Sequence, residues 1–240
     1  MARYLEVERQ GNICVLVLQR PEKDNALNYR LARELVQALS RLERARGISC
    51  LVVTGAGDQA FCSGADLEER RRGPTLAATR EAMAMLERLP IASIAAVNGR
   101  AHGGGALLAV SCDLRLAAPQ ATFRFPGANL GLVVGAAQLP RLVGLARAKE
   151  LIYTGRVVSA EEAAAIGLVN RVIPAVDLMR EAHALAEIIA ANSCRAIAAA
   201  KKVMELAADN RVALELELET NAVLRRSTEF RQRARRFVGR

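Results

Sequence analysis

The 240-residue sequence contains few aromatic residues: no tryptophan, three tyrosines and five phenylalanines. Because hydrophobic residues still make up 52% of the chain, the core must be built from alanine, leucine, valine and isoleucine. The 34 basic residues also lack the interleaved aromatic side chains on which single-stranded nucleic acids stack. The sequence therefore argues against nucleic acid as a partner, despite a formal net charge of +9.

Long hydrophobic runs and ordered cysteine pairs are absent as well. No apolar run approaches the roughly 18 residues expected of a membrane span. Residues 1–8 alternate charged with apolar side chains, unlike a signal peptide. The five cysteines are scattered and odd in number, and no pair has metal-ligand spacing. We expect a cytoplasmic protein with reduced thiols, no membrane partner and no metal.

The order of apolar patterns predicts the fold class. Segments typical of buried strands alternate with helical segments as far as about residue 173. After Pro174 only helical patterns follow, at about residues 176–192, 194–207, 211–226 and 228–237. This order predicts an α/β fold with a helical C-terminal part. We place the boundary between a domain of residues 1–190 and a helical region of residues 191–240.

Residues 212–219 (VALELELE) carry two conflicting signals. They alternate with period two, as a strand does, but alanine, leucine and glutamate are strong helix formers. As a helix, the segment places Leu214 and Leu218 on one face and Leu216 on another. A helix with two apolar faces fits between its own domain and a partner subunit.

Two glycine-containing turns follow segments typical of buried strands. Gly103, Gly104 and Gly105 separate the strand pattern of residues 91–97 from an apolar helical segment, and Gly64 follows the strand pattern of residues 49–54. We expect each turn to open a helix, whose first N–H groups have no partner and lie at the positive end of the helix dipole. The two turns therefore predict a site for an oxygen that becomes negative during a reaction.

Residues 60–66 (AFCSGAD), 96–105 (AVNGRAHGGG) and 112–113 (CD) have the order and spacing by which this chain resembles the enoyl-CoA hydratase/isomerase (crotonase) superfamily. Weaker similarities extend over nearly all of the chain. The resemblance implies a crotonase-like right-handed spiral of β-β-α units, with homotrimers and often hexamers formed through the C-terminal helices. It also implies an acyl-CoA thioester substrate, in which coenzyme A is part of the substrate and not a tightly bound cofactor.

The resemblance assigns roles to individual residues. It implies that the N–H groups of Ala65 and Gly104 hold the thioester carbonyl oxygen and stabilise an enolate. His102, two residues before Gly104, is either a general acid or base or a loop histidine bonded to backbone. The other residues expected in the substrate and coenzyme A site are Lys23, Asn25, Ala26, Leu27, Gly64, Asp66, Leu67, Gly103, Leu107 and Gly127.

The sequence departs from the hydratase pattern at two positions. Hydratases of this superfamily place one glutamate two residues after the glycine triplet and another after the proline of the next loop. This chain has Leu107 and Gly127 there. Hydration needs one group to activate water and one to protonate the α-carbon, which neither residue can do.

We therefore expect an acyl-CoA enzyme, a lyase or isomerase, that stabilises a thioester enolate but hydrates enoyl-CoA poorly. Decarboxylation of a malonyl-type thioester needs only the oxyanion site and an apolar pocket. Double-bond isomerisation would use His102. The remaining alternative is a non-catalytic relative that binds coenzyme A or RNA.

Overall fold

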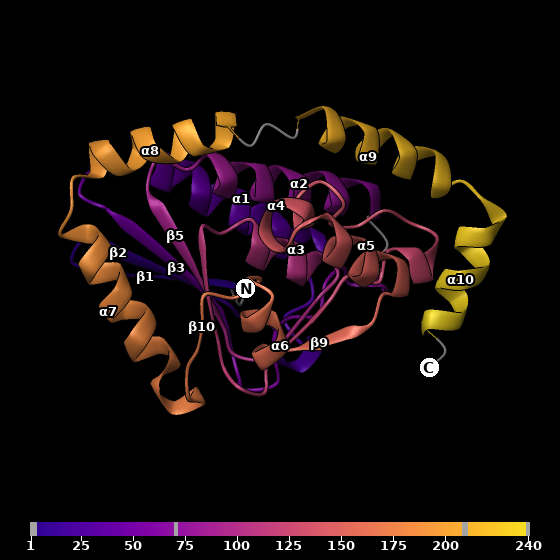
Figure 1. The fold of residues 1–240 in the computed structure, drawn as a ribbon, viewed down its shortest axis with the longest axis horizontal. Helices are drawn as coiled ribbons and strands as arrows, with labels where there is room; N and C mark the ends of the chain where they lie inside the picture. The colour runs from indigo at the N-terminus through magenta and orange to yellow at the C-terminus, as the bar shows by residue number, and fades with distance from the viewer. Residues whose placement is uncertain (1–3, 70–71, 208–210, 239–240) are drawn as a thin grey trace.

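The computed structural model describes residues 4–69, 72–207 and 211–238, which form two sheets surrounded by helices (Figure 1). In these residues the larger sheet has six strands and the smaller has four. Neighbouring strands are parallel except in the pairs β1–β2 and β8–β9. The larger sheet contains, in order, β1 (Leu5–Gln10), β2 (Ile13–Leu18), β3 (Cys50–Gly55), β5 (Ala92–Val97), β7 (Leu114–Ala117) and β10 (Arg171–Val172). The smaller contains β4 (Ala60–Cys62), β6 (Arg100–His102), β8 (Thr122–Arg124) and β9 (Val157–Ser159).

Pairs of strands alternate with helices along the first half of the chain. The units β1-β2-α1, β3-β4-α2 and β5-β6-α3 follow one another. In the second and third units, the first strand joins the larger sheet and the second joins the smaller. This confirms the predicted α/β class and its succession of β-β-α units. The three helices are α1 (Tyr29–Arg44), α2 (Arg72–Arg88) and α3 (Gly104–Val110).

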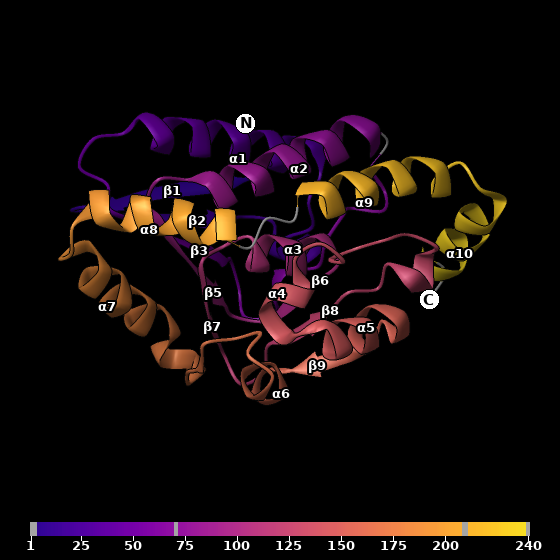
Figure 2. The same ribbon diagram turned by 45° about the horizontal axis from the view of Figure 1, so that its top comes forward.

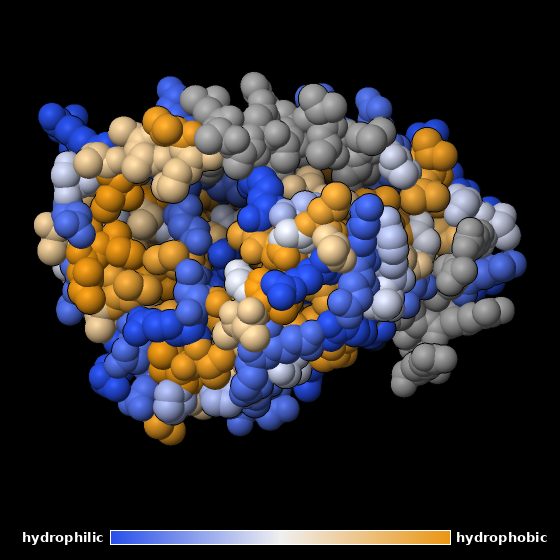
Figure 3. All heavy atoms as spheres, viewed as in Figure 1, coloured by the Kyte–Doolittle hydropathy of each residue, from blue (hydrophilic) through white to orange (hydrophobic). Residues whose placement is uncertain are grey.

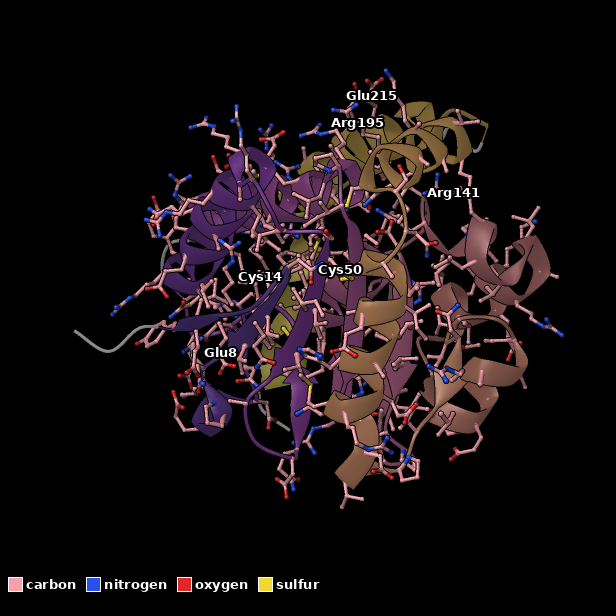
Figure 4. The ribbon with its side chains drawn as sticks, turned by 90° about the vertical axis from the view of Figure 1, so that its left-hand side faces the viewer. Glu8, Cys14, Cys50, Arg141, Arg195 and Glu215 are labelled. Atoms are coloured by element: carbon pink, nitrogen blue, oxygen red, sulfur yellow. The ribbon has the colours of Figure 1, made fainter. Side chains whose placement is uncertain are left out.

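The central strands β3 and β5 of the larger sheet are buried along their whole length, as expected of strands covered on both faces, and most of their residues are apolar. α1 and α2 lie side by side over one face, and α7 (Leu178–Ala190) packs against β3 and β5 on the other (Figure 2). Cys14 and Cys50 belong to adjacent strands and to the two different cores (Figure 4). Burial raises the pKa of the Cys14 thiol, and that of Cys50 to about 12. These thiols are therefore protonated and unreactive at neutral pH.

The chain ends in helices, as the sequence predicts. α8 (Cys194–Ala207), α9 (Arg211–Leu224) and α10 (Thr228–Val238) follow α7 along the outside of the molecule (Figure 1). α9 confirms the helical interpretation of residues 212–219, although the side chains of Leu214 and Leu216 lie outside the described part of the chain. Shorter helices come before α7 along the chain. They are α4 (Leu139–Val143), α5 (Leu145–Thr154), α6 (Ala160–Ala165) and the 3-10 helices Pro21–Lys23, Ala128–Leu130 and Ala175–Asp177.

Lys201 joins α8 to the sheet domain. Its Nζ donates to the carbonyl oxygen of Leu86 at 3.1 Å and to Asp113 Oδ2 at 3.0 Å, and the lysine is 8% exposed. Asp113 also accepts hydrogen bonds from the backbone and hydroxyl of Ser93. This contact joins residues on the two sides of the boundary that we place after residue 190. The boundary itself stays a prediction. Among the described residues no helix is both long and apolar enough to cross a bilayer.

Candidate functional site

The turn at Gly103 places the first amides of α3 at the meeting point of β4 and β6. Gly103 has a φ of +52°, and its N–H donates to the carbonyl oxygen of Arg124 at 2.9 Å. The first hydrogen bond of the helix runs from Leu107 N to Gly103 O at 3.0 Å. Gly104, the first residue of α3, therefore presents an N–H without an intrahelical acceptor.

Gly105 is required because the helix packs directly on the backbone of β4. A Cβ added to Gly105 would lie 1.8 Å from the carbonyl oxygen of Cys62, where no side chain fits. The position of the Gly104 amide is therefore fixed by backbone packing against the smaller sheet.

The Ala65 amide is positioned in a different way. Ala65 forms an isolated parallel β-bridge with Leu27. Leu27 N donates to Gly64 O at 2.7 Å, and Asp66 N donates to Leu27 O at 3.0 Å. Because the groups flanking Ala65 face Leu27, the N–H of Ala65 itself points to the opposite side. Ala65 as a residue is exposed.

Gly64 brings the two amides together. Its φ is +103°, and an added Cβ would lie 2.7 Å from His102 O and 3.1 Å from Gly104 N. A Cβ on Gly104 would lie 3.6 Å from Ala65 N. Two donors that share one oxygen at about 2.7–3.1 Å must be neighbours of this kind. The structure thus brings together the two residues that the sequence singles out as carbonyl-binding donors.

The expectation that the Ala65 turn opens a helix is wrong. Residues 66–69 form a turn, in which Asp66 Oδ1 accepts from Glu68 N at 3.1 Å and Asp66 O accepts from Glu69 N at 3.2 Å. α2 begins only at Arg72. The bridge to Leu27 holds the backbone extended through Ala65, so a helix cannot start there.

His102 turns its ring away from the helix and toward the smaller sheet. Its Nε2 lies 3.0 Å from Thr122 Oγ1 on β8. Burial, together with the positive charges of Arg124 and Arg100, lowers the pKa of His102 to about 4. The imidazole is therefore neutral at pH 7 and a weak base. The sequence leaves open a purely structural role, in which the His102 ring would bond to backbone. In the structure its partner is a side chain, that of Thr122.

The three acidic residues that follow Ala65 are all engaged inside the chain. Asp66 Oδ2 accepts from Arg20 at 2.9 Å, and Glu68 Oε2 accepts from Lys23 at 2.9 Å. Glu69 Oε2 accepts from Tyr29 N at 2.9 Å. Each of these carboxylates is thus engaged by another group of the chain, and none is positioned to exchange a proton with a substrate bound at the two amides. Within the described residues, no three His, Cys, Asp or Glu side chains are grouped closely enough to bind a metal ion.

The sequence model of the enoyl-CoA hydratase/isomerase family matches residues 8–237 of this chain. The chain belongs to that family. It is 35% identical to the short-chain-enoyl-CoA hydratase of Clostridium acetobutylicum, over 88% of this chain and 86% of the relative. The crotonyl-CoA hydratase of Syntrophomonas wolfei is also 35% identical, with the same coverage.

Solved structures of the family share the fold. An enoyl-CoA hydratase from Bacillus anthracis has a TM-score of 0.83 and 35% identity, covering 94% of this chain and 92% of that one. A monofunctional enoyl-CoA isomerase from M. smegmatis has a TM-score of 0.78 and 33% identity, covering 87% and 95%. The family thus includes both hydration and isomerisation on one scaffold, and the site must decide between such reactions.

Leu107 and Gly127 occupy apolar and crowded surroundings in this family member. Leu107 is half-buried and packs against the main core. A Cβ added to Gly127 would lie 2.8 Å from both Leu132 O and Val134 N, and 3.0 Å from the Val134 Cβ. The loop that follows Gly127 therefore leaves no room for a side chain at this position.

This loop is also held by the C-terminal region. Asn221 on α9 accepts from Val133 N at 2.8 Å through Oδ1 and donates to Val133 O at 2.7 Å through Nδ2. Leu132 N donates to Gly127 O at 2.8 Å, which closes the loop on itself. α9 thus contributes to the shape of the loop opposite the glycine triplet. Nothing in the sequence pattern of α9 indicates this contact.

Among the residues expected to bind coenzyme A, several stabilise their own loop. Asn25 is fully buried with a φ of +55°, and its Nδ2 donates to Ala60 O at 2.8 Å. The Ala26 carbonyl accepts from Arg20, and Leu27 forms the bridge to Ala65. Lys23 is exposed, and its hydrogen bond to Glu68 raises its pKa. Leu67 lies in the turn after Asp66. The assignment of these five residues to the coenzyme A site stays a prediction.

Proposed function

We propose that this chain binds acyl-CoA thioesters and stabilises their enolates with the Ala65 and Gly104 amides. The observation that carries the proposal is the meeting of these two N–H groups at Gly64. Donors that are fixed before the reaction stabilise the oxygen as its negative charge develops and need no reorganisation. Membership of the enoyl-CoA hydratase/isomerase family supports a thioester substrate.

The surroundings of the two amides disfavour efficient hydration. Leu107 and Gly127 supply no carboxylate, and the acidic residues 66, 68 and 69 are engaged by other groups. His102, with a pKa of about 4 and a hydrogen bond to Thr122, is poorly suited to exchange protons at neutral pH. These features support an enolate-forming reaction that requires no positioned acid or base.

Decarboxylation of a malonyl-type thioester fits these requirements. The bond between the α-carbon and the carboxylate breaks, carbon dioxide leaves, and the electron pair moves into the thioester to form the enolate. The two amides stabilise the enolate oxygen, and a proton from water then completes the α-carbon. The apolar Leu107 side chain favours loss of a charged carboxylate as a neutral gas.

A panel of acyl-CoA thioesters, with products separated by liquid chromatography and identified by mass spectrometry, tests the proposal. We expect loss of carbon dioxide from malonyl-type thioesters and little gain of water by crotonyl-CoA. Isomerisation without a change in mass would exclude decarboxylation as the main reaction. If no thioester binds or reacts, the acyl-CoA proposal as a whole is wrong.

Two variants of Gly104 isolate the amide as the active group. Gly104→Pro removes the N–H, whereas Gly104→Ala retains it, and both add a Cβ near Leu27 Cδ1 at 3.4 Å. The proline variant should lose about 10²–10³-fold in kcat relative to the alanine variant, the usual effect of removing one such donor. Equal activity of the two variants would show that this N–H stabilises no charge.

We also propose that the chain forms a homotrimer or hexamer through its C-terminal helices. Exposed apolar side chains support this: Ile188 on α7, Val203 and Met204 on α8, and Val223 on α9. Apolar surface gathers over α7 in Figure 3, as expected of a surface that another subunit covers. Sedimentation at micromolar concentration should show a trimer or hexamer, and a stable monomer would contradict the proposal.

A further inference from the structure

Arg20 is a buried cation that contacts both segments of the Leu27–Ala65 bridge. Its side chain is 7% exposed, and it enters the structure just before the 3-10 helix Pro21–Lys23. Its Nη1 donates to the carbonyl oxygen of Ala26, and its Nη2 donates to Asp66 Oδ2 at 2.9 Å. These acceptors belong to the residue before Leu27 and the residue after Ala65. The guanidinium therefore spans both strands of the bridge that orients the Ala65 N–H.

Arg20 makes two further contacts, one through its guanidinium and one through its backbone. Its Cζ lies 5.1 Å from the centroid of the Tyr4 ring, within the range of a cation–π interaction. The Nε atom is buried and has no hydrogen-bond partner among the described residues. The Arg20 N–H donates to Asn25 Oδ1 at 2.9 Å, which ties the start of the loop to its middle.

Stability alone is a weak reason for this arrangement. Both side chains of the Arg20–Asp66 ion pair are nearly buried, at 7% and 12% exposure. Burial removes both charges from water, and this cost offsets much of their attraction, so such pairs add little stability. A planar guanidinium does, however, offer two rigidly spaced nitrogens to two acceptors, whereas a lysine ammonium offers one freely rotating nitrogen.

We propose that Arg20 is a positioning residue for the oxyanion site. It acts through Asp66 and Ala26: by holding both sides of the Leu27–Ala65 bridge, it directs the Ala65 N–H toward the thioester oxygen. This inference rests on the proposed function, because it assigns the Ala65 amide to a carbonyl. A misplacement of about 1 Å costs up to about 10²-fold in rate.

Carbonyl polarisation provides a readout that stability does not affect. A conjugated dienoyl-CoA absorbs at longer wavelength when hydrogen bonds polarise its thioester carbonyl. We expect a red shift on binding to the unmodified protein and at least half of that shift to be lost in Arg20→Lys. The variant retains the charge, but its shorter side chain has a single nitrogen in place of the Nη1 and Nη2 that bind Ala26 O and Asp66 Oδ2. The dissociation constant should change less than kcat, because most of coenzyme A binds elsewhere.

Arg30→Lys is the matched control. Arg30 also lies over the Tyr4 ring, at 4.6 Å, and forms an ion pair with Glu34 within α1. This variant should retain the full red shift and kcat. Arg20→Met, which removes the charge, should lose at least as much of the shift as Arg20→Lys; where it fails to fold, Arg20→Lys alone decides.

A full red shift in Arg20→Lys, with or without a lower melting temperature, would overturn the inference and leave Arg20 a purely structural residue. The absence of a red shift in the unmodified protein is a different outcome. It would refute the proposed oxyanion site itself, whatever the Arg20 variants do.

Discussion

The two halves of the proposed oxyanion site present the same chemical group on two different supports. Gly104 offers its N–H at the start of α3, where helix geometry leaves it without a partner. Ala65 offers its N–H from an extended segment, where the bridge to Leu27 turns it outward. The first support is local in sequence, whereas the second joins residues 38 positions apart. Local support can be recognised from a sequence, and remote support cannot.

The two halves of the site also differ in the substitutions that they tolerate. The helix half depends on close backbone packing at Gly105, where any side chain collides with β4. The bridge half depends on hydrogen bonds between loops and on the buried Arg20–Asp66 pair. We therefore expect substitutions in the helix half to affect folding first, and substitutions around the bridge to affect function first.

Gly105→Ala should have the largest effect. Its Cβ would meet Cys62 O at 1.8 Å, so α3 must move away from β4, at a cost of more than about 4 kcal/mol of unfolding free energy. Urea unfolding measures this cost. Gly73→Ala is the control, because nothing lies within 4 Å of its added Cβ and the change should stay within about 1 kcal/mol. A small effect at Gly105 would show that the helix is not packed as described.

Gly64→Ala should affect both halves at once. A φ of +103° strains any side chain, and the Cβ would crowd His102 O at 2.7 Å. We expect a loss of about 1–3 kcal/mol of stability from strain, and weaker binding of acyl-CoA in calorimetry. Gly11→Ala, with a φ of +62° and open space, carries the strain without the crowding. If both variants bind acyl-CoA as the unmodified protein does, Gly64 does not align the two amides.

His102→Gln should alter the pH dependence of stability. The pKa of about 4 in the folded chain lies below the ordinary value of 6.5, so the unfolded chain binds the proton first as pH falls. The unmodified protein therefore loses stability between pH 6.5 and about 4, by at most about 3 kcal/mol. Unfolding across this range should show a smaller slope for the variant than for the unmodified protein. Equal slopes for His102→Gln and the unmodified protein would contradict the burial of His102.

Leu107→Glu should produce the smallest change, a gain in crotonyl-CoA hydration of about tenfold. One carboxylate without its usual partner supplies less than the 10²–10⁴-fold of a positioned acid or base. Leu107→Gln, which has the same shape without the charge, should show no gain. A second glutamate at Gly127 should fail, because its Cβ would lie 2.8 Å from Leu132 O. Fast hydration by the unmodified protein would contradict the interpretation that Leu107 leaves the site without a carboxylate needed for hydration.

The sequence predicts the helix half well, because glycines, a strand pattern and an apolar helix follow one another within 20 residues. It predicts the position of Ala65 through family resemblance but not its support, since the bridge to Leu27 is a single residue pair outside any strand and leaves no periodic pattern in the sequence. Asp66 illustrates the limit: the sequence predicts a helix after the turn at Gly64, whereas Asp66 pairs with Arg20, which lies 46 residues away. The crowding at Gly127 arises because the loop that follows folds back against it, at Leu132 and Val134. The composition of this loop does not predict that path.

The crystal structure of a complex with a slowly reacting acyl-CoA thioester would test the central claim most directly. We predict that the thioester oxygen lies about 2.7–3.1 Å from both Ala65 N and Gly104 N. The acyl chain should pass Leu107. A thioester oxygen bound to any other pair of groups, with these two amides facing solvent, would contradict the account.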